Sequence, residues 1–262
     1  MSNMGTATDS KEAYEQRMNA YQDEINQILR QEKIVADLSE KDPDGSIYKK
    51  IMLIDELLYV VTLYLAKSRL TVLTGNGKIE DILNEARKIL YKVIIYLEDI
   101  VSNFIDAPFS DYEEKVKKIE YVPQKHRYYL VRKLGLAIDL VIQAYGDNSK
   151  WKWAFVEIQG RFATVAKNIL DLKDTASTGF DPHSPDYETT MFHLKLVKKL
   201  LLQAATKYRE KYATVTQSAE DFRLSIQYLS AVHRMHILLN ERNEAEEVKK
   251  KITIWSAKKK SG

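Results

Sequence analysis

The sequence SIYKKIMLIDELLYVVTLYLAKSRLTVL, residues 46–73, is the most apolar stretch of the chain. Its apolar residues point in almost every direction around a helix, and such a helix must be covered on most sides by its neighbours. We therefore expect a buried central helix at 46–73. Its uninterrupted run of apolar or weakly polar residues, 57–66, is shorter than the roughly 20 residues that cross a bilayer. The sequence therefore predicts no transmembrane segment.

The rest of the chain also has helical patterns. Its 262 residues include only nine glycines and five prolines, which favours long helices over many short strands. After the sequence GNG at residues 75–77, residues 79–105 repeat apolar side chains at helical spacing. Seven further helices are predicted at residues 10–38, 113–123, 124–145, 150–172, 185–213, 218–239 and from 243 into the lysine-rich end. The sequence thus predicts an all-α fold of about nine mostly antiparallel helices, in a multi-helix bundle or in stacked helical hairpins.

The longest stretch without helical periodicity is KDTASTGFDPHSP, residues 173–185. A stretch of this length and composition is typical of a loop or a linker. It predicts an N-terminal helical bundle at residues 1–172 and C-terminal helices at 186–262 that pack on the bundle. One continuous domain is the alternative.

The first predicted helix carries a narrow apolar seam. Large residues recur along it at alternating intervals of four and three, which is typical of coiled-coil packing. The next position of the seam is Glu32, where the pattern breaks. The seam predicts either a cover for the central helix or a contact between copies in a homo-oligomer. Its members are Tyr14, Met18, Tyr21, Ile25 and Ile28.

The composition of the chain limits the classes of function that the protein can have. The net charge of +3 is too small to imply a polyanionic partner by itself. The chain has no cysteine, which excludes disulfides, thiolate metal sites and a cysteine nucleophile. The first residues lack a basic segment followed by an apolar run, so no secretory signal is predicted. We interpret the protein as cytoplasmic.

The sequence lacks the common catalytic and cofactor motifs at their characteristic spacings. Glu-x-x-His, HExxH, Walker-type and GxSxG patterns do not occur in the sequence. We therefore predict no enzyme, no cofactor and no metal site. A metal- or phosphate-dependent enzyme remains an alternative, based on Asp181, His183 and Asp186 in the long loop. His233 and His236, three residues apart on one helix, could also share a metal.

Two basic clusters offer a binding surface, one at residues 115–133 and one at 195–199. The first mixes cations with tyrosines, a combination that can contact phosphates while the rings stack on bases. These clusters predict nucleic-acid binding as one alternative, and the solvated faces of amphipathic helices as the other. The candidate residues are Lys125, Arg127, Tyr128, Arg132, Lys195, Lys198 and Lys199.

Aromatic residues favour a protein partner. The chain has sixteen tyrosines, and Trp151 and Trp153 open a predicted helix. Tyrosine and tryptophan are enriched in protein interfaces. Because two aromatics at this spacing cannot face the same way on a helix, one of them is available to a partner or to another part of the chain. Our leading hypothesis is a non-enzymatic helical adaptor or scaffold that binds another protein through helix faces or a groove.

Overall fold

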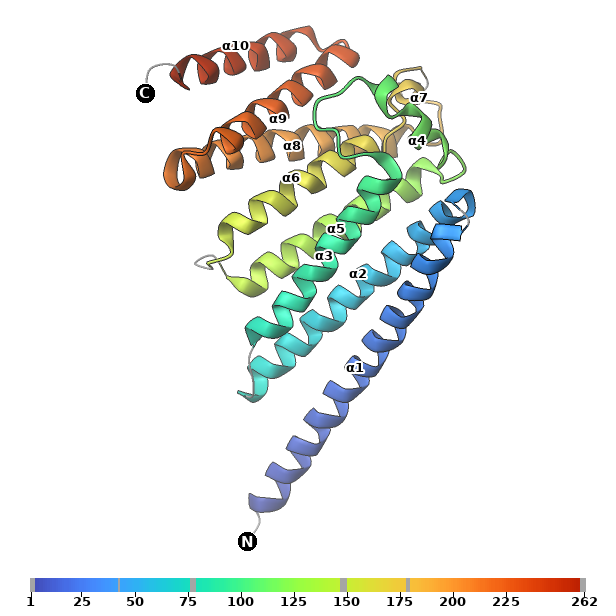
Figure 1. Ribbon diagram of the computed structural model, residues 1–262, viewed down its shortest axis with the longest axis vertical. Helices are drawn as coiled ribbons and strands as arrows, with labels where there is room; N and C mark the ends of the chain where they lie inside the picture. The colour runs from blue at the N-terminus through green and yellow to red at the C-terminus, as the bar shows by residue number, and fades with distance from the viewer. Residues whose placement is uncertain (1–2, 42, 76–78, 147–149, 178–179, 260–262) are drawn as a thin grey trace. The chain divides into compact units, whose positions relative to one another are not determined.

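The computed structural model describes residues 3–41, 43–75, 79–146, 150–177 and 180–259. Within these ranges it contains ten α-helices and no strand, which confirms the predicted all-α fold (Figure 1). A 3-10 turn, η1 (Phe109–Asp111), and a π-helical turn, η2 (Tyr212–Thr216), complete the regular structure. The helices are α1 (Asn3–Lys41), α2 (Pro43–Thr74), α3 (Ile79–Val101), α4 (Glu113–Lys117), α5 (Gln124–Tyr145), α6 (Lys152–Asn168), α7 (Leu172–Ser177), α8 (Tyr187–Lys211), α9 (Ala219–Leu238) and α10 (Arg242–Lys259).

Packing divides the chain into two compact units. Unit 1 comprises Met1–Tyr96 and Lys133–Ser149, and unit 2 comprises Leu97–Arg132 and Lys150–Gly262. α3 and α5 therefore contribute residues to both units. Compactness alone does not define an independently folding domain. The predicted division into residues 1–172, 173–185 and 186–262 stays a prediction.

In unit 1, α2 is buried around most of its circumference, as the apolar stretch predicted. α1 packs along it in the opposite direction (Figure 1), and Lys67 Nζ donates to Gln22 Oε1 at 2.5 Å between the two helices. Gly75, with a φ of +68°, ends α2 in the left-handed conformation that closes many helices. Residues 76–78, which include the rest of the GNG sequence, lie outside the described residues. The buried apolar side chains of α2 are Leu53, Ile54, Leu57, Leu58, Val60, Val61, Leu63, Tyr64 and Leu65.

The seam of α1 faces its own chain. Ile25 and Ile28 are buried, while Tyr14, Met18 and Tyr21 are half-buried. The seam does not break at Glu32 as predicted: Glu32 is buried, and its carboxylate accepts hydrogen bonds from Lys92 and Tyr96 of α3. A polar group thus continues the seam because a neighbouring helix satisfies it. Ile25 and Ile28 act as the intramolecular cover, which removes the two most apolar seam positions from any contact between copies.

In unit 2, the central element is α6, which packs on α8, while α8 packs on α9 and α9 on α10. Gly160 in α6 marks a close approach between helices. A Cβ atom there would lie 2.7 Å from the Tyr228 hydroxyl and 2.8 Å from a ring carbon of Tyr208. The two tyrosine rings, from α9 and α8, stack at 5.6 Å between centroids. Because glycine has no Cβ atom, the two tyrosine rings can occupy the space beside residue 160.

Several predicted helix ends are wrong, and the helix predicted at 113–123 ends at Lys117. α3 ends at Val101 and not at residue 105, because Ser102 takes a φ of +109° and the Asn168 side chain donates to the carbonyls of Ser102 and Phe104. The helix predicted at 150–172 ends at Asn168, and α7 begins at Leu172. Asp171 starts α7, since its carboxylate accepts hydrogen bonds from the amides of Lys173 and Asp174.

Candidate functional site

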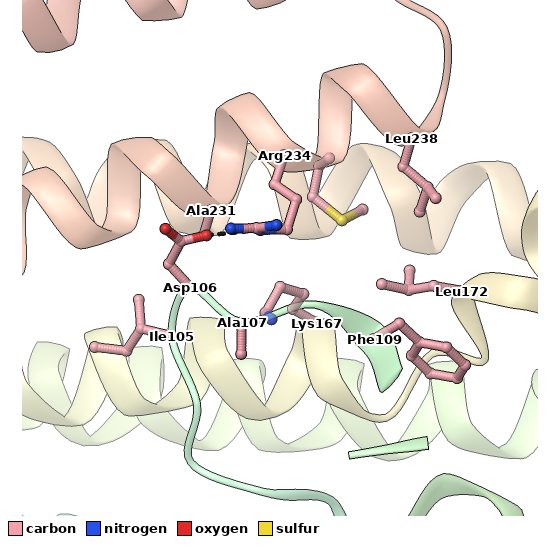
Figure 2. A pocket seen from close by; sticks show the side chains of 10 residues that line it. Ile105, Asp106, Ala107, Phe109, Lys167, Leu172, Ala231, Arg234 and Leu238 are labelled. Atoms are coloured by element: carbon pink, nitrogen blue, oxygen red, sulfur yellow. Dashed lines mark hydrogen bonds and ion pairs between the residues drawn. The ribbon is translucent and has the colours of Figure 1, made fainter. Parts of the chain in front are cut away.

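A pocket opens within unit 2, between the segment that follows α3 and the helices α6, α7 and α9 (Figure 2). It has about 350 Å³ of empty volume, including the part open to solvent. Because this volume includes open solvent, the enclosed part is small and suits a short side chain or a small ligand. Its lining consists of Ile105, Asp106, Ala107, Phe109, Lys167, Leu172, Ala231, Arg234, Met235 and Leu238.

The wall of the pocket at residues 105–109 is held in place by α6. Asn168 Nδ2 donates to Ser102 O at 2.9 Å and to Phe104 O at 3.2 Å. The Ser102 hydroxyl in turn accepts from the Phe104 amide at 3.0 Å. These bonds fix an irregular segment immediately before the lining residues, so the pocket is largely formed without a ligand.

Lys167 is the unusual member of the lining. Its side chain is only 3% exposed, and its ammonium lies 5.0 Å from the centroid of the Tyr112 ring. No protein group among the described residues hydrogen-bonds to it. Burial lowers the pKa of Lys167 to about 8, opposed by the negative charge of Asp106 and assisted by the positive charge of Arg234. A cation in such surroundings is a functional-site candidate.

The other two charges of the pocket pair with each other. Arg234 Nε donates to Asp106 Oδ1 at 2.8 Å (Figure 2). Below the pKa of Lys167, two cations and one anion therefore line an otherwise apolar cavity. This arrangement can hold an apolar group that carries one negative charge. No sequence pattern predicted this group of charges. Lys167 lies in a mostly apolar helix, and Asp106 lies in a loop directly after the helix predicted at 79–105.

The candidate residues of α5 have different surroundings. Arg127 is buried, and its guanidinium donates to three carbonyls: Ile119 O at 2.6 Å, Val122 O at 2.9 Å and Ile169 O at 3.2 Å. It joins segments of unit 2, so its predicted role at a binding surface is corrected to a structural one. Burial is possible for this charge because each of the three guanidinium nitrogens donates to a carbonyl.

Lys125 and Arg132 of α5 are exposed, as the prediction requires. Lys125 Nζ lies 5.8 Å from the centroid of the Tyr129 ring, and the Arg132 guanidinium lies 5.8 Å from that of Tyr128. The faces of these tyrosines are thus partly covered by cations of the same helix. They are less open to a stacked base than the sequence suggested.

On α8, Lys195 and Lys199 are exposed, whereas Lys198 is not a free cation. Lys198 Nζ donates to both carboxylate oxygens of Glu241, at 2.6 and 2.8 Å. His236 Nδ1 lies 2.6 Å from the same carboxylate. The prediction for Lys198 is corrected, because its ammonium anchors the turn between α9 and α10 to α8.

Trp151 and Trp153 are half-buried at the start of α6 and do not line the pocket. Lys150 Nζ lies 5.6 Å from the Trp151 ring, and Lys152 Nζ lies 4.9 Å from the Trp153 ring. Each tryptophan thus has a neighbouring lysine as a cation–π partner. Their availability to a protein partner stays a prediction.

The residues considered for metal binding do not converge. Within the described part of the chain, no group of three or more His, Asp or Glu side chains is placed to hold a metal ion. Asp181 accepts the His183 amide in a turn, at 2.9 Å. The nearby His193 is buried between Gln124 and the Ala166 carbonyl, each 3.0 Å from a ring nitrogen, so the imidazole is neutral and carries its proton on Nε2.

Unit 1 presents an apolar stripe on the outer face of α2. We call it the α2 stripe, and it consists of Tyr48, Met52, Tyr59, Ala66 and Leu73. Four of its members recur every seventh residue, a spacing that keeps them on one side of a helix. Met52 is 70% and Leu73 is 83% exposed. The Tyr59 hydroxyl donates to Glu24 of α1 at 2.9 Å, and its ring is nearly half exposed.

No helix within the described ranges is long and apolar enough to cross a membrane. Comparisons with curated proteins and with solved structures found no match. A family profile covers nearly the whole chain, from residue 10 to residue 261. The chain therefore belongs to the TP0443 family.

Proposed function

We propose that this protein is a helical adaptor or scaffold that binds another protein through the α2 stripe. The observation that carries the proposal is the exposure of large apolar side chains on one side of a helix that is otherwise a core element. Exposed apolar residues that line up over several turns mark interaction sites more often than isolated ones do. The stripe includes two tyrosines and one methionine, Tyr48, Tyr59 and Met52. Both residue types are enriched in protein interfaces.

The spacing of the stripe favours a helical partner. From Tyr48 to Leu73 the stripe runs for roughly 37 Å at 1.5 Å per residue. Residues repeating every seven positions match the repeat of a second helix that lies along them. Asp55 and Arg69 border the stripe, and the Asp55 carboxylate is paired with Lys133 of α5 at 2.6 Å. The proposed partner segment is therefore an amphipathic helix with an apolar seam and mixed charges at its edges.

Nucleic-acid binding is the alternative, and it has less support. Of the seven candidate residues, Arg127 and Lys198 are engaged within the chain, and Tyr128 has Arg132 over its ring. Lys125, Arg132, Lys195 and Lys199 remain as exposed cations. We further propose that the protein has no catalytic role and works in the cytoplasm, a compartment that suits a chain without cysteine.

The test is capture of a partner by matched variants. The double variant Met52→Asp, Leu73→Asp places charges in the stripe without touching the core. Ile254→Asp, on α10 and 56% exposed, is the control of the same chemistry. From an extract of the producing cells, wild type and control should retain a common protein that the double variant loses. That protein, once purified, should bind the wild-type chain directly.

Thermal unfolding checks that the double variant is folded, since both substituted side chains are largely exposed. Retention of the same proteins by all three chains would overturn the proposal. So would the absence of any protein that distinguishes the double variant from the control.

A further inference from the structure

The buried ammonium of Lys167 lacks a counter-charge in direct contact. Its one close neighbour is the face of the Tyr112 ring, at 5.0 Å. An ammonium that is removed from water is costly unless it is paired and hydrogen-bonded. The hydroxyl of Tyr112, which is also buried, finds no partner within the described part of the chain. Lys167 lines the pocket and Tyr112 does not, so the Lys167 ammonium is the group that an additional ligand would satisfy.

The protein itself does not supply the missing anion. Asp106 is the only carboxylate in the lining, and it forms its ion pair with Arg234. No ion pair between Lys167 and any described carboxylate exists within 4 Å. The three charged side chains therefore sum to one positive charge while Lys167 is protonated. A ligand with a single negative charge would neutralise the pocket.

The remaining lining residues indicate the chemistry of the rest of the ligand. It consists of aliphatic, aromatic and thioether side chains: Ile105, Phe109, Leu172, Ala231, Met235 and Leu238. A phosphate group demands several donors and more than one free cation, and this pocket offers one lysine among apolar groups. A carboxylate on a short branched aliphatic body fits both the charge and the apolar lining of the pocket.

We propose that this pocket binds a carboxylate carried on a short aliphatic body, with the Lys167 ammonium as its counter-ion. The same chemistry occurs in a free short-chain acid and in the C-terminal residue of a polypeptide that ends in leucine. The site is separate from the α2 stripe in residues and in ligand class. Loss of either proposal leaves the other intact.

The experiment compares charged and neutral probes of equal shape by titration calorimetry and by ligand-observed NMR. The free acid is represented by 4-methylpentanoate and its control by 4-methylpentanamide. The peptide terminus is represented by N-acetylglycyl-leucine and its control by the corresponding amide. Wild type should bind at least one acid more tightly than its amide by about tenfold or more, the change expected for one charge-assisted hydrogen bond.

Variants assign the effect to the pocket. Lys167→Met keeps most of the length of the side chain and removes its charge, so it should reduce acid binding by about tenfold and leave amide binding unchanged. Lys195→Met removes an exposed lysine of unit 2 and should bind like wild type. If both 4-methylpentanoate and the peptide bind, the pocket recognises the carboxylate and aliphatic body that the two probes share. Binding of the peptide alone assigns the site to a polypeptide terminus, and binding of the free acid alone assigns it to a small molecule.

Two results would overturn the proposal. One is equal affinity for acid and amide in the wild-type chain, a comparison that holds even if Lys167→Met fails to fold. The other is the absence of binding by either acid at concentrations up to roughly 10 mM, where even a weak specific site is occupied.

Discussion

At the scale of single residues, Gly160 shows how tertiary packing opposes helix propensity. Alanine is favoured over glycine within a helix by about 1 kcal/mol. At this position the added Cβ would lie 2.7 Å from the Tyr228 hydroxyl and 2.8 Å from Tyr208. Both tyrosines are buried, so neither ring can move into solvent. The clash should outweigh the gain in propensity.

We expect Gly160→Ala to lower the free energy of unfolding by about 1 to 3 kcal/mol, the usual cost of overpacking. Urea denaturation followed by circular dichroism measures the change. Adding Tyr228→Phe removes the atom nearest to the new methyl group and should recover part of the loss. A variant as stable as wild type would mean that the two rings can separate from α6 at little cost.

His193 links the core of unit 2 to pH. Its ring is fully buried, and burial lowers its pKa to about 4, with the nearby charge of Arg127 acting in the same direction and the Ala166 carbonyl opposing it. An unfolded histidine takes up its proton near pH 6.5. Between these two values the unfolded state binds more protons than the folded state. The free energy of unfolding must therefore fall as pH falls from 6.5 towards 4.

We expect this residue to contribute roughly 2 to 3 kcal/mol to the loss of stability between pH 7.5 and pH 4.5. His193→Gln should reduce the pH dependence by that amount, because glutamine has no proton to take up in this range. His183→Gln, at an exposed position, is the control and should leave the pH dependence unchanged. Identical pH profiles for wild type and His193→Gln would show that the folded protein protonates His193 without penalty.

At the scale of elements, α2 contributes completely buried side chains to the core of unit 1. Leu57 and Val61 are completely buried and lie four residues apart on the same side. Leu57→Ala should lower the free energy of unfolding by about 2 to 5 kcal/mol through the cavity that it leaves. Val61→Asp should cost more, because it buries a charge with no partner. Chemical denaturation of both variants measures these losses.

The exposed Met52 of the same helix provides the comparison. Met52→Ala should change the stability by no more than about 0.5 kcal/mol, as surface substitutions usually do. Both substitutions introduce alanine into the same helix. The difference between their losses of stability therefore reports the effect of burial and not that of helix propensity. An unchanged thermal midpoint for Val61→Asp would contradict the position of α2 at the centre of unit 1.

The elements also show which features a sequence can predict. The bounds of α5 agree with the prediction because Pro123 and Gly146, on either side, are local signals. The end of α3 was predicted four residues too far, because the carbonyls beyond it are bound by Asn168, which is distant in sequence. A local sequence pattern contains signals such as Pro123 and Gly146, but it does not contain a contact with a distant residue such as Asn168.

The candidate sites differ for the same reason. Arg127 was predicted at a binding surface because it belongs to a cluster that mixes cations with tyrosines. Its three acceptors, at residues 119, 122 and 169, come together only in the folded unit. Lys167 went unnoticed, although a lone lysine in the run FATVAKNIL of residues 162–170 is a weak signal of a buried charge. The partners of a buried charge cannot be read from its neighbours in the chain.

At the scale of the whole molecule, the balance of charge separates the two classes of partner. The net charge of +3 comes from 40 basic and 37 acidic residues. Several lysines of the basic clusters are neutralised within the chain, including Lys117 by Glu113 and Glu114, and Lys198 by Glu241. A protein that holds nucleic acid through phosphates keeps such cations free and loses affinity steeply as salt rises. We therefore expect only weak, unspecific binding to nucleic acid.

Fluorescence anisotropy with a labelled single strand of about 20 nucleotides, long enough for the sites of most single-strand binders, tests this expectation in both DNA and RNA. At 50 mM salt we expect a dissociation constant no tighter than roughly 10⁻⁵ M, and at 200 mM salt no measurable binding, as for unspecific contacts. The double variant Lys125→Ala, Arg132→Ala should behave like wild type. Tight binding at 200 mM salt that this variant loses would replace the adaptor proposal by the nucleic-acid alternative, because two exposed cations of α5 would then carry the affinity.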